Sequence, residues 1–171
     1  MPFIFGYGSL LNESYRAISY ATLMPNPDFP VRRAFNAHCE YAFADSESPV
    51  KYTALGLEYV PQGLATCVNG LIIEVTREQF DEIVTREKGY RQLRLDASCF
   101  AGLPSAIDSD IYVFVPETPE YPTEEYPLNR AYIDLCIAGF VRCNFQYAID
   151  FLRLTAGWSP DLLEYALAKL Q

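Results

Sequence analysis

The sequence has 171 residues, of which 50% are hydrophobic, 15% aromatic and 20% charged, with a formal net charge of −9. This composition excludes a disordered chain and fits one globular domain spanning residues 1–171. The acidic balance repels a phosphate backbone, so we expect no nucleic-acid partner. Its apolar runs fall short of the ~20 residues that cross a bilayer, and the N-terminus lacks a signal-peptide pattern, so we expect a cytoplasmic protein without membrane contact.

The first half of the chain predicts strands interrupted by a short helix. The apolar run Pro2–Phe5 ends at a glycine and is typical of a strand. Asn12 is a candidate N-cap for a short helix at Glu13–Ile18. Prolines at positions 25, 27 and 30 exclude regular structure there, and a loop is expected around Asp45–Pro49. Three more strands are predicted from alternating hydrophobicity, at residues 31–43, 52–60 and 67–75.

The second half predicts one inserted helix, two more strands and three C-terminal helices. Thr76 and Gln79 have the spacing of a capping box, and the helix that they start should end near Gly89. Ser159 followed by Pro160 signals the start of the last helix. The strands are expected at residues 90–100 and 110–115, and the C-terminal helices at residues 129–139, 144–156 and 160–170. Together these elements predict an α+β domain with a mixed, strongly curved, barrel-like β-sheet.

Histidine and cysteine usage limits the chemistry. The one histidine, His38, lies in an alternating stretch and is interpreted as a surface or structural residue. A Ser-His-Asp or Cys-His system would depend on it alone. None of the five cysteines has CxxC spacing, which favours scattered reduced thiols. We therefore expect no metal ion and no other cofactor.

A glycine-rich loop follows the first predicted strand. Its residues are Phe5, Gly6, Tyr7, Gly8, Ser9 and Leu10. Glycines on both sides of Tyr7 permit positive φ, so successive N–H groups could converge on a carboxylate or an oxyanion. A helix starting near Asn12 would add its positive end. An ordinary tight turn stays open, whereas the spacing excludes a Rossmann or Walker loop.

Glu87 is the second candidate. It lies four residues after Ile83 and three after Val84, which places it on the predicted buried face of its helix. A carboxylate there is costly unless paired or neutralised. Burial and the negative end of the helix dipole would raise its pKa, as a general acid/base near neutral pH requires. An ion pair with Arg91 or Arg94, or a frayed helix end in water, stays open.

These two features occur together in a known family. Phe5–Leu10 resembles the YGSL loop of the gamma-glutamylcyclotransferase superfamily, which includes ChaC-like and AIG2-like proteins. Arg86–Tyr90 is similar to that family's RE-x-GY segment, whose glutamate is the acid/base. Arg32–Asn36 resembles the family's basic-aromatic strand, and Ala131–Gly139 its Y-x-x-x-I-x-x-G helix. Phe151–Trp158 resembles the tail of some ChaC-like members.

The resemblance implies cyclisation of a γ-glutamyl peptide or amine to 5-oxoproline, with Glu87 as the general acid/base. It also implies that the glycine-rich loop and Tyr132 bind this small-molecule substrate, although a core role explains Tyr132 equally well. Arg33 is interpreted as an exposed strand residue, or as one that attracts an anionic substrate. Two alternatives stay open: a non-catalytic binding module of the same fold, and an enzyme that removes a γ-glutamyl protecting group from a specialised metabolite. The acidic stretch Pro116–Pro127 predicts a solvated loop, with a lid or a dimer contact as alternatives, and the protein is expected to be a monomer or homodimer.

Overall fold

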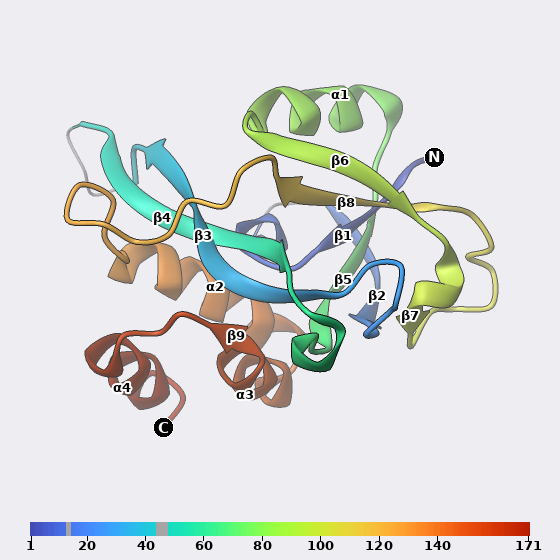
Figure 1. Ribbon diagram of the computed structural model, residues 1–171. Coiled ribbons are helices and arrows are strands. Elements are labelled where there is room, and N and C mark those ends of the chain that lie inside the picture. Colours follow the sequence, from blue (N-terminus) through green and yellow to red (C-terminus); the bar gives the residue numbers. More distant parts are fainter. Residues whose placement is uncertain (13–14, 44–47) are drawn as a thin grey trace.

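The computed structural model describes residues 1–12, 15–43 and 48–171, which form two β-sheets and four α-helices (Figure 1). The larger sheet, in the order β6-β8-β1-β5-β2-β7, contains β1 (Phe3–Gly6), β2 (Arg16–Leu23), β5 (Val68–Glu74), β6 (Tyr90–Leu95), β7 (Phe100–Ala101) and β8 (Ile111–Pro116). The smaller sheet, in the order β4-β3-β9, contains β3 (Val31–Tyr41), β4 (Val50–Tyr59) and β9 (Thr155–Ala156). The helices are α1 (Arg77–Arg86), α2 (Arg130–Cys143), α3 (Phe145–Arg153) and α4 (Pro160–Ala168).

The predicted α+β class is confirmed, with α1 inserted among the strands and α2, α3 and α4 at the C-terminal end. Both sheets are mixed: β1 pairs antiparallel with β5 and parallel with β8, and β3 pairs antiparallel with β4 and parallel with β9. The six-stranded sheet curls into half a barrel, as expected, while three strands separate into the second sheet. Figure 1 shows α1 on one side of the strands and the three C-terminal helices gathered on the opposite side.

Side-chain caps explain where three of the helices begin. Thr76 and Gln79 form both bonds of the predicted capping box of α1. Asn129 caps α2 through its side chain, and Asn144 both ends α2 and caps α3. Ser159 is the N-cap residue of α4 but makes no side-chain cap bond. The start of α4 is therefore favoured by Pro160, whose fixed φ suits the first helical position. No helix in the described ranges is long and apolar enough to cross a membrane.

The short helix predicted at Glu13–Ile18 is wrong for the residues that the structure describes. Arg16–Leu23 form strand β2, which pairs along its length with β5. Asn12 is the last residue of a 3-10 helix, Ser9–Asn12, and not an N-cap. An isolated helix of six residues is marginal, whereas the ladder with β5 satisfies the backbone groups of the strand. Glu13 and Ser14, and residues 45–47 of the predicted loop, lie outside the described residues.

The acidic segment after β8 is attached to the smaller sheet. Glu120 donates its backbone N–H to the carbonyl of Asn36 at 2.8 Å, and Thr53 donates its own to the carbonyl of Pro127 at 2.9 Å. The ring of His38 stacks on Tyr126 with centroids 4.2 Å apart. One side of the segment therefore faces solvent, as predicted, while the other side is fixed across β3 and β4, which the sequence did not indicate.

Candidate active site

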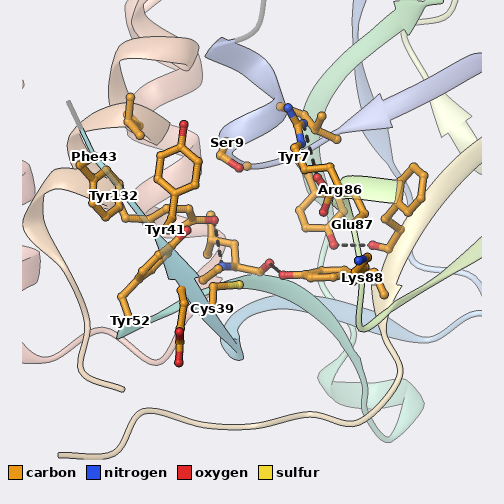
Figure 2. A pocket seen from close by; sticks show the side chains of 18 of the residues that line it. Tyr7, Ser9, Cys39, Tyr41, Phe43, Tyr52, Arg86, Glu87, Lys88 and Tyr132 are labelled. Atoms are coloured by element: carbon orange, nitrogen blue, oxygen red, sulfur yellow. Dashed lines mark hydrogen bonds and ion pairs between the residues drawn. The ribbon is translucent and has the colours of Figure 1, made fainter. Parts of the chain in front are cut away.

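A cavity of 410 Å³ lies between the loop after β1, the C-terminal end of α1, the paired ends of β3 and β4, and α2 (Figure 2). Gly6 is the one candidate site residue that does not line it. The candidates that do are Phe5, Tyr7, Gly8, Ser9, Leu10, Glu87 and Tyr132. These residues come from three places in the sequence. The fold therefore brings the glycine-rich loop, the glutamate and the α2 tyrosine to one enclosed space.

Glu87 is the residue at which α1 ends. Its backbone N–H still donates to Ile83 at 2.8 Å, and its carbonyl accepts from the N–H of Tyr90 at 3.0 Å. The side chain is 18% exposed, and its Oε1 lies 3.4 Å from Nη2 of Arg86. Val84, predicted to be buried, is instead 37% exposed, so the buried face of α1 is narrower than its sequence suggests. Glu87 reaches the cavity because it caps the helix, and its backbone bonds hold it there.

The predicted ion pairs of Glu87 with Arg91 or Arg94 are replaced by other contacts. Arg94 pairs with Asp110. A charged neighbour of Glu87 is Arg86, the preceding residue. The predicted frayed end is also wrong, since the carboxylate lines the cavity. Glu87 is therefore a partly buried carboxylate beside the guanidinium of Arg86 at the edge of a cavity.

The glycine-rich loop does not form the predicted anion-binding nest. Neither Gly6 nor Gly8 has positive φ; the positive-φ glycines in the described ranges are Gly89, Gly102 and Gly157. The physical reason is that the chain passes from β1 almost directly into the 3-10 helix Ser9–Asn12, a right-handed turn that requires negative φ.

The two glycines supply space instead. A Cβ at Gly6 would lie 3.0 Å from Cδ1 of Ile73, and a Cβ at Gly8 would lie 3.5 Å from the hydroxyl of Tyr132. Glycine at position 8 therefore keeps the gap between the loop and α2 open. The N–H groups at the start of a 3-10 helix have no acceptor within it, so those of Ser9 and Leu10 can donate to a bound anion.

Three tyrosine hydroxyls are fixed by backbone groups around the cavity. Tyr132 accepts from the N–H of Leu55 at 3.0 Å, and Tyr90 donates to the carbonyl of the same residue at 2.8 Å. Tyr7 donates to the carbonyl of Phe114 at 2.5 Å. Burial raises the pKa of all three hydroxyls above the usual range for tyrosine.

After burial, the negative charge of Glu87 also raises the pKa of Tyr7 and of Tyr90. The hydroxyls therefore stay protonated at neutral pH. Tyr132 uses an oxygen lone pair for Leu55, so its hydroxyl can still donate its proton, and the buried thiol of Cys136 is one acceptor beside it.

Cys39, Tyr52 and Tyr90 line the same cavity and were missed by the sequence reasoning. Cys39 lies near the end of β3, where the alternating pattern continues, but nothing in that pattern shows which face of the strand meets a cavity. Burial, followed by the charges of Glu87 and Glu120, raises the pKa of the Cys39 thiol to about 11. A thiol of this kind is neutral at pH 7 and is a poor nucleophile.

The interpretation of Arg33 as an exposed strand residue is wrong, and Arg33 does not line the cavity. Its side chain is fully buried and donates to five acceptors. These are Oγ1 of Thr155 at 2.7 Å, the carbonyl and Oδ1 of Asn69 at 2.8 and 2.7 Å, the carbonyl of Tyr7 at 3.2 Å and that of Phe151 at 3.3 Å. Burial lowers the pKa of Arg33 to about 9, so it remains a cation at neutral pH. Arg33 thus ties the glycine-rich loop to β5, α3 and β9.

Among the described residues, no three His, Cys, Asp or Glu side chains come together in a way that could hold a metal ion. The polar residues that line the cavity are two glutamates, Glu40 and Glu87, two basic residues, Arg86 and Lys88, and several tyrosines, with Ser9 and Cys39. This set suits proton transfer and the binding of a small zwitterion.

Comparisons with known proteins identify the fold. No family model matches the sequence, and no curated protein matches it. One similar solved structure is described as a gamma-glutamyl cyclotransferase: it is 12% identical, with a TM-score of 0.58, and the alignment covers 98% of each chain. Another is YkqA from Bacillus subtilis, 12% identical with a TM-score of 0.52, where the alignment covers 99% of this chain but 54% of YkqA. The chain therefore has the gamma-glutamylcyclotransferase-like fold that its motifs resemble.

Proposed function

We propose that this protein is a γ-glutamylcyclotransferase, which cyclises the γ-glutamyl group of a small peptide or amide to 5-oxoproline and releases the amine. The observation that carries the proposal is the meeting, in one cavity, of the Glu87 carboxylate, the first amides of the 3-10 helix and the protonated hydroxyl of Tyr132. The similar structure described as a gamma-glutamyl cyclotransferase supports it at the level of the fold.

Glu87 supplies the proton transfers that this reaction needs. The α-amine of the substrate attacks its own γ-carbonyl carbon, forming a C–N bond, and the bond from that carbon to the departing nitrogen then breaks. The attacking ammonium loses a proton before this step, and the departing nitrogen gains one. A single carboxylate beside both nitrogens can accept the first proton and return it, so the reaction consumes no water and needs no enzyme nucleophile.

The remaining polar groups hold the charges of the substrate. We assign contacts with the substrate to the amides of Ser9 and Leu10 and to the hydroxyl of Tyr132, which belong to residues that line the same cavity. Donors fixed in this way stabilise the oxyanion that forms on the γ-carbonyl. Arg86 places a positive charge beside Glu87, where it attracts the α-carboxylate of the γ-glutamyl group.

The direct test is incubation of the purified protein with glutathione, γ-glutamyl-alanine and γ-glutamyl-lysine, followed by quantification of 5-oxoproline. We expect release of 5-oxoproline from at least one of the three. Failure with all of them, and with the γ-glutamyl amides described below, would overturn the proposed function and favour a binding module with the same fold.

Gly8→Ala is expected to lower kcat/KM for 5-oxoproline release by roughly tenfold, because the new methyl group enters the cavity. Its Cβ would lie 3.5 Å from the Tyr132 hydroxyl and 3.5 Å from Cδ1 of Leu55. Steady-state kinetics measure the effect. The matched control is Gly63→Ala, where a Cβ would meet nothing within 4 Å. Equal losses in the two variants would show that Gly8 does not border the substrate.

A further inference from the structure

Four aromatic side chains form a continuous surface along one part of the cavity (Figure 2). We call Tyr41, Phe43, Tyr52 and Tyr132 the aromatic wall. Successive ring centroids are 5.3, 5.3 and 5.0 Å apart from Tyr41 to Tyr132. Tyr41 is 54% exposed although it lines the cavity. The wall therefore presents apolar area that a bound molecule could cover.

The charged residues of the cavity are unevenly placed. Arg86, Glu87 and Lys88 stand together at the end of α1, and Figure 2 shows them on the opposite side of Ser9 from the aromatic wall. Glu40, which precedes Tyr41 in β3, also lines the cavity, but its Oε1 lies 3.8 Å from Nζ of Lys51 and accepts from the hydroxyl of Tyr126 at 3.4 Å, so its charge is paired. The cavity therefore has one end with charges of both signs and another end that is aromatic.

This asymmetry orients a γ-glutamyl substrate. Its α-ammonium and α-carboxylate require charges of both signs, which the α1 end provides through Glu87 and Arg86. The amine portion then extends away from that end, past Tyr132 and along the wall. A carboxylate on the amine portion would lose water against the rings, so it would be disfavoured.

We propose that the aromatic wall binds the amine portion of the substrate, and that this portion is an aromatic or bulky apolar amine without a carboxylate. The preferred substrate class is thus γ-glutamyl amides of apolar amines, in preference to γ-glutamyl amino acids or glutathione. This inference rests on the proposed cyclisation and adds to it the chemistry of the leaving amine.

The test compares three substrates that differ by one group each. γ-Glutamyl-phenethylamide and γ-glutamyl-ethylamide differ by a ring, and γ-glutamyl-phenylalanine adds only a carboxylate to the phenethylamide. We expect kcat/KM for the phenethylamide to exceed that for the ethylamide by about tenfold, the effect of covering one aromatic ring. It should also exceed that for γ-glutamyl-phenylalanine, whose carboxylate loses water against the rings. Equal values, or a preference for γ-glutamyl-phenylalanine, would overturn the proposal.

One variant and its control attribute the preference to a named side chain. Tyr41→Ala should reduce the ratio of the phenethylamide to the ethylamide by several fold. Tyr59→Ala is the matched control, because Tyr59 is 52% exposed and lies outside the cavity. If Tyr41→Ala leaves the ratio as it is, the wall does not bind the amine.

Binding separates this proposal from the proposed function. Calorimetry with the Glu87→Gln variant should show about tenfold tighter binding of the phenethylamide than of the ethylamide, whether or not turnover occurs. Ring-dependent binding without 5-oxoproline release from the wild-type protein would overturn the cyclotransferase proposal alone. Release of 5-oxoproline without any preference for the phenethylamide over the ethylamide would overturn only the proposal that the aromatic wall binds the amine portion.

Discussion

Glu87→Gln is expected to lower kcat for 5-oxoproline release by roughly 10²–10⁴-fold, the usual contribution of a general acid/base. A carboxamide of the same shape neither accepts the proton of the attacking amine nor returns one to the departing nitrogen. The fold should be retained, because the bonds that hold the residue at the end of α1 come from its backbone N–H and carbonyl. Substrate affinity, measured by calorimetry, should change far less than kcat.

Glu82→Gln is the matched control for this variant. It removes a carboxylate from the same helix at an exposed position outside the cavity, so its kcat should equal that of the wild-type protein. Far-UV circular dichroism and thermal unfolding check the fold of both proteins. Full activity of Glu87→Gln would remove Glu87 from the mechanism, and activity lost together with the folded spectrum would indicate a structural role.

Local patterns in the sequence predicted those parts of the site that depend on short-range structure. The capping box of Thr76 and Gln79 and the positive-φ Gly89 bracket α1, and they place Glu87 at its end. Helical spacing alone would have placed Val84 inside as well, and it is exposed. The end of a helix was therefore a better guide to the position of Glu87 than the periodicity of its face.

The parts that were missed depend on contacts between distant segments. Strand β2 is stabilised by its hydrogen-bond ladder with β5, which lies far along the sequence. No local pattern in Arg16–Leu23 predicts that pairing. Tyr52 and Cys39 reach the cavity because β3 and β4 pair, with Cys39 opposite Tyr52. The alternation of a strand shows which residues share a face, but only tertiary packing decides which face is covered.

Arg33 is the strongest example of this limit, since a strand arginine is usually exposed. Here β9 pairs with β3 at this residue, and Phe151 of α3 lies beneath the guanidinium at 4.7 Å from its carbon to the ring centroid. Burying a cation is costly, and five hydrogen bonds to neutral acceptors offset that cost.

Arg33→Met is therefore expected to lower the free energy of unfolding by about 3–5 kcal/mol. The change removes the desolvation penalty of one cation, but it leaves buried acceptors on Asn69 and Tyr7 without this donor, each at about 1–3 kcal/mol. The carbonyl of Phe151 keeps the hydroxyl of Thr155 at 2.6 Å. Arg33→Lys should also destabilise the protein, because an ammonium cannot reproduce the planar set of donors. Urea unfolding at neutral pH measures both effects.

Arg16→Met provides the comparison that isolates burial from charge. Arg16 also pairs with a partner across strands, Glu74 at 2.6 Å, but its side chain is 73% exposed, so its loss should cost less than about 1 kcal/mol. An Arg33→Met protein as stable as the wild type would mean that desolvation of the guanidinium outweighs all five bonds. The expected large loss would instead make Arg33 the residue that holds the carbonyl of Tyr7, and with it the glycine-rich loop, at the distance from α2 that the cavity requires.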